Sequence, residues 1–448
     1  MINRRQLLAS SGAVTASGLL GGLSFPGIAA GDDYKALVVI HLNGGSDANN
    51  ALIPTDGAYL DYQAARQNLA IPKRSLVNLA GSSIGHTFGL HSSLADIAPL
   101  YDQRRLAFIS NVGPLVEPTT AEKVLAGTAR VPPFLLSHND QTSMVQGWSI
   151  NAGNDSGWGG RGLEMLPSSL KNPISAVTMD TNRTLVLGNQ SAISFMPPGG
   201  ARHWGTADLA YPSSEASQSL NRMANWQFAG DYEAEYARTM GNAIADQTRF
   251  VRAFQKAVAP TADFGTDDIG YKLRSLASVL PIFKSQGLKR QVFLIHWGGF
   301  DTHSNQRGTG ANTQDTQFIA MAKALAAFDE TNKANGMDMN VVSVVMSEFG
   351  RTLRPGSAGG SEHAWGSHWM AMGGPVAGGN VVGSFPSLVL GGADDGDLGK
   401  NGRFVPTIGS DQVGATLLQW LGVSSTNFVN VFPDLANFQT KTIPLFRS

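Results

Sequence analysis

Three apolar runs, rich in aliphatic and β-branched residues, stand out along the chain, at 36–42, 291–297 and 341–346. Each has the length of a strand. None shows the alternation of polar and apolar residues that is typical of a strand with one exposed face, so each is expected to be buried on both faces. Between the second and third runs, from about residue 313 to 332, apolar residues recur at helical spacing. Strand, helix and strand in this order predict a parallel crossover and therefore an α/β fold with a mainly parallel central sheet.

The rest of the chain adds helices to this pattern. Residues 221–258 are rich in alanine and charge and predict a helix, and we interpret about 200–290 as a helical insertion or cap. Near the end, Ser410 and Asp411 have the character of an N-cap, and Gly422 suits the position after the last turn. We therefore predict one large α/β domain over residues 31–448.

Residues 1–30 have the features of an export signal. Arg4 and Arg5 precede a weakly apolar stretch rich in Gly, Ser and Ala, and small residues near Ala29 and Ala30 suit a cleavage site. The stretch is too short and too often interrupted to be a strong membrane anchor. We predict a twin-arginine signal peptide, a periplasmic or extracellular location and no integral membrane span after cleavage.

The amino-acid composition excludes several classes of function. Lys and Arg number 33 and Asp and Glu 34, so the formal net charge is -1, which does not fit a nucleic-acid-binding protein. The chain has no cysteine, which excludes disulfides, thiolate metal sites and a cysteine nucleophile.

Polar residues follow the strands directly, at the edge where open α/β sheets bind ligands. Asp301 and His303 follow the second strand and have the spacing to share a divalent cation, or to form a local hydrogen bond. Glu348 and Arg351 follow the third strand. Glu348 is a candidate metal ligand or general base, and Arg351 is a candidate oxyanion-binding group. The alternative is that the two form a salt bridge with each other.

Two further segments combine histidine with other polar groups. Residues 362–368 hold two imidazoles in a glycine-flanked loop. In the segment 137–142, either Ser137 or Thr142 is a candidate nucleophile with His138 as its base, although such neighbours are common by chance.

Taken in order, these segments resemble one family, the exported bacterial proteins known as domain of unknown function 1501, in the alkaline phosphatase and sulfatase fold group. The resemblance covers nearly the whole chain after residue 30. It is carried by the motifs at 44–50, 88–91, 137–141, 157–161, 299–303, 347–352, 362–368, 373–379 and 383–386.

The resemblance implies an alkaline phosphatase-like three-layer sandwich with divalent metal at the carboxyl edge of the sheet. Carried over residue by residue, the implied metal ligands are Asp301, His303, Glu348 and His363 or His368. The chain departs from the enzymes at two places. Asn43 stands where they have a metal-binding Asp, and Phe349 stands where they have a His, so a two-metal site is incomplete.

We therefore expect a metal-dependent hydrolase of phosphate or sulfate esters that uses zinc, manganese or calcium. In this reading Arg351, His138 and Asp47 take part in catalysis, while Asn43, Asn50 and Trp365 bind substrate. The alternative is a non-catalytic exported protein with a degenerate site that binds an exported protein partner.

Overall fold

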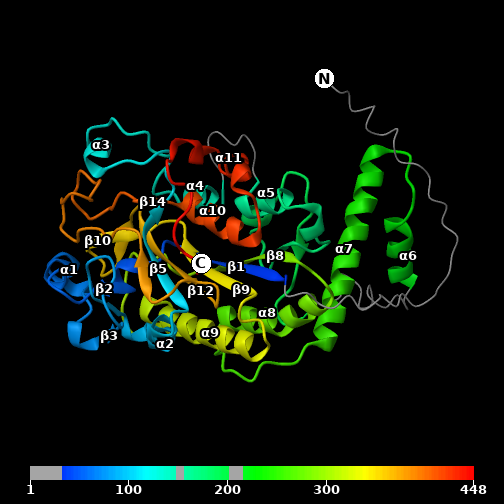
Figure 1. The fold of residues 1–448 in the computed structure, drawn as a ribbon, viewed down its shortest axis with the longest axis horizontal. Coiled ribbons are helices and arrows are strands. Elements are labelled where there is room, and N and C mark those ends of the chain that lie inside the picture. The colour runs from blue at the N-terminus through cyan, green and yellow to red at the C-terminus, as the bar shows by residue number, and fades with distance from the viewer. Residues whose placement is uncertain (1–32, 148–155, 201–214, 448) are drawn as a thin grey trace. The chain divides into compact units, whose positions relative to one another are not determined.

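The computed structural model describes residues 33–147, 156–200 and 215–447. Its centre is a nine-stranded sheet with the order β13-β5-β12-β9-β1-β8-β6-β7, in which β14 also pairs with β5 (Figure 1). Every pairing in this sheet is parallel except those of β12, which is antiparallel to β9 and to β5. The predicted α/β class with a mainly parallel sheet is confirmed.

The three predicted runs form the middle of the sheet. They are β1 (Lys35–Leu42), β8 (Arg290–Trp297) and β9 (Val341–Ser347), and β1 lies between the other two. Helix α9 (Gln314–Ala334) connects β8 to β9, so the predicted crossover is also confirmed. The other strands of the sheet are β5 (Leu106–Gly113), β6 (Ala176–Thr178), β7 (Ser194–Phe195), β12 (Ser367–Met372), β13 (Asn380–Val382) and β14 (Ile408–Gly409).

Helices cover both faces of the sheet, which makes three layers (Figure 1). Along β1, Val38 and Ile40 point into the core shared with α8 (Asp268–Ser285) and α9, while Leu37 and Val39 point into the opposite core. That second core includes α5 (Trp158–Glu164) and α10 (Ser410–Leu421). Burial on both faces explains why these strands are continuously apolar.

Two helix predictions need correction at their ends. The predicted helix 221–258 is two helices, α6 (Glu215–Ala224) and α7 (Asp231–Lys256). Helix α10 begins at Ser410, after Gly409 as N-cap, whereas Gly422 ends it in the left-handed conformation as predicted.

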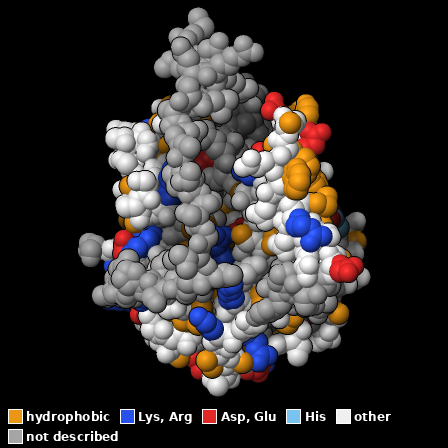
Figure 2. Space-filling model, turned by 90° about the vertical axis from the view of Figure 1, so that its right-hand side faces the viewer, with side chains coloured by type: hydrophobic (Ala, Val, Ile, Leu, Met, Phe, Trp, Pro, Cys, Tyr) orange, Lys and Arg blue, Asp and Glu red, His pale blue; other side chains and the backbone are white. Residues whose placement is uncertain are grey.

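The region predicted as an insertion or cap, about 200–290, divides into two parts. Leu273, Leu276 and Leu280 of α8 are fully buried against the sheet, so α8 belongs to one of the covering layers. Helices α6 and α7 expose large hydrophobic side chains instead. The side of the molecule on which these two helices lie faces the viewer in Figure 2. Within the described residues no helix is long and apolar enough to cross a membrane.

The remaining elements lie around this frame. A three-stranded sheet has the order β2-β4-β3, and a two-stranded sheet pairs β10 with β11. Their bounds are β2 (Leu52–Pro54), β3 (Val77–Asn78), β4 (Phe88–Leu90), β10 (Arg351–Pro355) and β11 (Ser361–His363), and the shorter helices are α1 (Tyr59–Arg66), α2 (Ala98–Asp102), α3 (Ala121–Leu125), α4 (His138–Val145) and α11 (Phe428–Val431). The predicted signal segment 1–30 lies outside the described residues.

Candidate metal centre

The carboxyl ends of β1, β8 and β9 meet beside a cavity of about 480 Å³. Helix α4 closes one side of this cavity, and the loop after β8 forms another. The lining residues are Asn43, Gly44, His138, Asn139, Thr142, Ser143, Asn182, Thr184, Gly298, Gly299, Asp301 and Glu348.

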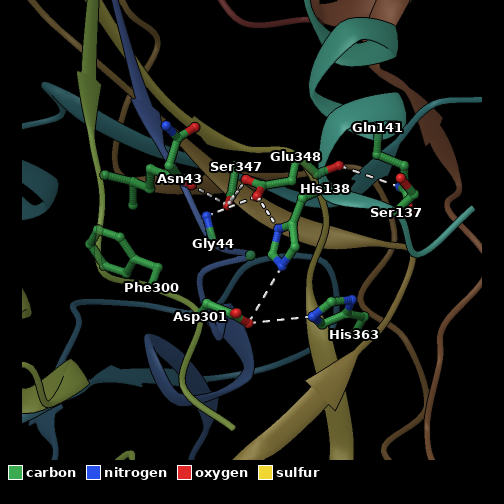
Figure 3. Close-up of polar contacts among 12 residues, drawn as sticks. Asn43, Gly44, Ser137, His138, Gln141, Phe300, Asp301, Ser347, Glu348 and His363 are labelled. Atoms are coloured by element: carbon green, nitrogen blue, oxygen red, sulfur yellow. Dashed lines mark hydrogen bonds and ion pairs between the residues drawn. The ribbon is translucent and has the colours of Figure 1, made fainter.

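Three imidazole rings surround one carboxylate oxygen. The Oδ1 atom of Asp301 lies 3.0 Å from Nε2 of His303, 3.3 Å from Nε2 of His363 and 3.5 Å from Nε2 of His138. Figure 3 shows His138 and His363 directed at Asp301 from different segments. Ligand atoms of His138, Asp301 and His363 all lie within 4.8 Å of one another, which makes a group able to hold a metal ion.

The other nitrogen of each ring has its own acceptor. Nδ1 of His138 lies 2.8 Å from Oε1 of Glu348, and Nδ1 of His363 lies 2.8 Å from the backbone oxygen of Leu136. A proton on Nδ1 leaves the neutral ring with a lone pair on Nε2. Metal-binding histidines are oriented in this way by carboxylates and carbonyl oxygens.

His303 follows the same pattern near the protein surface. Its Nδ1 lies 2.7 Å from Oε2 of Glu362, and its Nε2 lies 2.9 Å from Nε2 of His363. Nε2 of His138 is buried and has no hydrogen-bond partner among the described residues. A cation between these nitrogens and Asp301 would satisfy all of them, so the donor set fits a divalent metal.

Glu348 orients this group from below. Its side chain is 2% exposed, and it accepts hydrogen bonds from His138, from His41 at 3.3 Å and from the backbone N–H of Gly44 at 2.8 Å. Burial acts to raise the pKa of Glu348, but the hydrogen bonds from His138 and His41 outweigh it and hold the pKa well below the usual range. We predicted Glu348 as a metal ligand; the structure places it behind His138, with both oxygens occupied.

Arg351 lies beneath Asp301 and does not reach the cavity. Its side chain is 0% exposed, and it donates to the backbone oxygens of Gly44, Gly45 and Ser361 and to Asp301. We predicted that Arg351 stabilises charge on the substrate. Its guanidinium instead ties the loops after β1 and β8 to β11.

The pKa values of the group differ with their surroundings. The hydrogen bond to Glu348 raises the pKa of His138, whereas burial lowers that of His363. Burial acts to raise the pKa of Asp301, but the hydrogen bond from Arg351 outweighs it and the pKa is lowered. At neutral pH Asp301 is therefore a carboxylate facing neutral His363.

Phe349 explains one departure from the enzyme pattern. It is buried, and its ring centroid lies 4.8 Å from that of His138 and 4.7 Å from that of His363. A Cβ atom on Gly45 would lie 2.2 Å from the Phe349 ring, and Gly45 has a φ of +73°. Phe349 thus packs against both imidazoles, whose own ring centroids lie 4.4 Å apart.

Asp47 and Asn50 lie away from the cavity. Asp47 is buried and forms an ion pair with Arg66, and Gln306 donates to it at 2.6 Å. Asn50 is fully buried, where its carbonyl oxygen accepts from Tyr62 at 2.8 Å. Both were predicted to act on substrate, but their polar atoms join the loop after β1 to α1.

Trp365 and His368 also lie elsewhere. The indole of Trp365 is buried and donates to the backbone oxygen of Pro114 at 2.9 Å. Nδ1 of His368 accepts from the backbone N–H of Asn111 at 3.1 Å, and burial lowers its pKa to about 4. His363, rather than His368, is therefore the late histidine that reaches Asp301.

Sequence reasoning missed three buried residues below the cavity: His41, His296 and Gln146. A signal for the two histidines was present, because Ile-His stands at the end of both β1 and β8, and the structure pairs His41 with His296 in register. No comparable signal marks Gln146, which reaches them from the end of α4.

Replacing Glu348 with glutamine should lower the free energy of unfolding of the metal-free protein by about 2 kcal/mol at pH 7, because charged hydrogen bonds are lost. The folded pKa of Glu348 lies below its ordinary value of 4.5. Its stabilising effect is therefore present above about pH 4.5 and is lost as the pH falls below that value.

Urea unfolding at pH 7 and at pH 3.5 measures this effect. We expect the difference between wild type and Glu348→Gln to shrink at pH 3.5. The exposed Glu330→Gln should match wild type at both pH values. An equal difference at both would contradict the assigned role of Glu348.

The comparisons with known proteins agree with the resemblance. The chain belongs to the family described as "Protein of unknown function (DUF1501)", which matches residues 34–396. No curated protein matches the chain.

Several solved structures are similar at low identity. The lipoteichoic acid synthase LtaP from Listeria monocytogenes is 10% identical, covers 91% of this chain and 78% of its own, and gives a TM-score of 0.33. The C-terminal periplasmic domain of EcEptC from Escherichia coli is 10% identical, with 92% and 89% covered and a TM-score of 0.34. The PsFucS1 sulfatase from Pseudoalteromonas sp. is 10% identical, with 89% and 69% covered and a TM-score of 0.33. At such TM-scores we infer neither activity nor metal from these likenesses.

Proposed function

We propose that this protein is a metal-dependent hydrolase of phosphate or sulfate esters. One observation carries the proposal: three imidazole Nε2 atoms converge on Oδ1 of Asp301, while each Nδ1 is committed to another acceptor. Such an arrangement places imidazole nitrogens and a carboxylate around one point, where they would stabilise a bound cation.

The donor set favours zinc among the metals that the sequence suggested. His138, His363 and Asp301 would hold the ion, with His303 as a further nitrogen donor. Nitrogen donors with one carboxylate suit zinc, whereas calcium prefers oxygen ligands alone. When bound, such an ion polarises the ester and makes water a stronger acid.

The chain's own residues supply orientation and a hydroxyl. Thr142 lines the cavity one helical turn after His138, so both side chains lie on the same side of α4. Ser137 instead donates its hydroxyl to Asp140. Of the two nucleophiles that the sequence left open, Thr142 is the one placed at the cavity.

Elemental analysis and an ester screen test the proposal. We expect about one zinc ion per chain, and zinc-dependent cleavage of p-nitrophenyl phosphate or p-nitrophenyl sulfate. Thr142→Val, which keeps the shape of the side chain, should bind metal but lose turnover. A protein with less than a few tenths of an equivalent of metal, and no thermal shift with added zinc, would contradict the metal-dependent reading.

A second candidate function is a non-catalytic exported binding protein. The described lining of the cavity has no Lys or Arg, and Arg351 is turned away from it. An anionic ester would then depend on the metal alone for positive charge. Stoichiometric metal without turnover of any ester tested would favour this candidate.

We also propose export by the twin-arginine pathway, on the residues before position 31. Arg4→Lys combined with Arg5→Lys should leave the protein in the cytoplasm. Unchanged periplasmic recovery of this double variant would contradict it.

A further inference from the structure

Two buried histidines are stacked beneath the cavity. His41 of β1 and His296 of β8 have ring centroids 4.8 Å apart and ring planes inclined by 13°. Both are buried, and they are paired in register across the two parallel strands. Neither belongs to the group around Asp301, so their polar atoms need another explanation.

Gln146 fixes the proton positions on both rings. Its Oε1 accepts a hydrogen bond from the backbone N–H of Leu185 at 3.1 Å. Because a backbone N–H can only donate, this contact identifies which end of the Gln146 amide is the oxygen. Nε2 of Gln146 therefore faces the rings, 3.3 Å from Nδ1 of His41 and 3.3 Å from Nε2 of His296. The amide has two protons, one for each ring nitrogen.

The remaining nitrogen of each ring must then donate. Burial lowers the pKa of His296 to about 3, so this ring is neutral and has its proton on Nδ1, 3.2 Å from Oδ1 of Asn43. In His41 the proton lies on Nε2, 3.3 Å from Oε2 of Glu348. These hydrogen bonds form one series, which runs through Asn43, His296, Gln146, His41 and Glu348. Each of them has one donor and one acceptor.

The series determines how Asn43 faces the cavity. Its carbonyl oxygen accepts from His296, so its NH₂ group is the part left for a ligand. Asn43 is partly exposed and lines the cavity, and no hydrogen bond of its Nδ2 atom is found among the described residues. Asn43 therefore offers its NH₂ group, and not its carbonyl oxygen, to a ligand in the cavity.

We propose that Asn43 is a ligand-binding residue whose side-chain NH₂ donates to a non-bridging oxygen of the phosphate or sulfate group, and that His296, Gln146 and His41 are its positioning residues. The identity of the ligand rests on the function proposed above. The same series ends at Glu348, which holds His138. The series therefore fixes the position of the Asn43 NH₂ group relative to the imidazole of His138.

The histidine tautomers test the positioning part without any ligand. Long-range ¹H–¹⁵N correlation spectra of the ¹⁵N-histidine-labelled, metal-free protein report which nitrogen has the proton. Signals are assigned with His41→Asn and His296→Asn. We expect the Nε2–H tautomer for His41 and the Nδ1–H tautomer for His296. The opposite tautomer at either position, or rapid exchange between the two, overturns the positioning series.

Binding of inorganic phosphate to the zinc-loaded protein tests the ligand-binding part. By calorimetry, Asn43→Ala should bind phosphate roughly tenfold more weakly, the loss of one hydrogen bond to a charged group. Asn43→Ala should keep wild-type zinc content, and the exposed Asn335→Ala should bind phosphate like wild type.

The outcomes separate this inference from the proposed function. Equal phosphate affinity in wild type and Asn43→Ala overturns the role of Asn43 and leaves the metal-dependent hydrolase standing. A wild-type protein that binds zinc but no phosphate overturns the ligand-binding role and favours the non-catalytic candidate. A wild-type protein without zinc overturns the proposed function, and the tautomers still decide the positioning series.

Discussion

Asp301→Asn is expected to abolish metal binding while leaving the protein folded. Asp301 supplies the negative charge at the point where three imidazole nitrogens meet, and nothing else among the described residues replaces it there. The asparagine oxygen can still accept from Arg351, so the contact that supports the loop survives. Zinc content should fall from about one ion per chain to less than about 0.1.

Affinity can be measured by zinc titration against a competing chelator. The loss should exceed the roughly 100-fold effect of removing an orienting group behind a ligand. The exposed Asp231→Asn on α7 is the matched control and should bind like wild type. Wild-type zinc content and affinity in Asp301→Asn would show that the metal, if bound, lies elsewhere.

Arg351→Met is expected to cause the largest loss of stability, about 3 to 5 kcal/mol in the free energy of unfolding. The guanidinium is buried and serves the backbone oxygens of Gly44, Gly45 and Ser361 as well as Asp301. Methionine fills much of the volume but leaves these acceptors without a donor. Urea unfolding monitored by circular dichroism gives the difference.

Two further variants keep this prediction decisive. Arg351→Lys retains the charge but cannot reach all these acceptors, and should lie between wild type and Arg351→Met. The exposed Arg354→Met on the same strand should stay within about 0.5 kcal/mol of wild type. A loss of less than about 1 kcal/mol in Arg351→Met would mean that these hydrogen bonds do not support the loops.

The centre of the fold was predictable because its signals are local. The strands β1, β8 and β9 are continuous apolar runs, and α9 repeats its apolar residues at helical spacing. The place of β12 was not predictable. Its direction depends on pairing with β9 and also with β5, and β5 is far away in the sequence.

The group around Asp301 was predictable in part for the same reason. Asp301 and His303 follow a strand directly, and their spacing indicated a shared site. Asp47 and Arg351 misled, because a charged residue beside a strand end is equally suited to bind backbone oxygens. Their burial and their partners, contributed by other segments, decide between these roles, and neither can be seen in a local pattern.

The arrangement of β1 has a consequence for synthesis. This strand is complete at Leu42, but its two neighbours in the sheet are β8 and β9, which begin at Arg290 and Val341. At ordinary elongation rates the ribosome needs roughly 10 to 50 s to make the first of these partners. During that time the apolar strand has neither of its partners and is exposed to aggregation. We therefore expect slower growth at low temperature to improve recombinant yield.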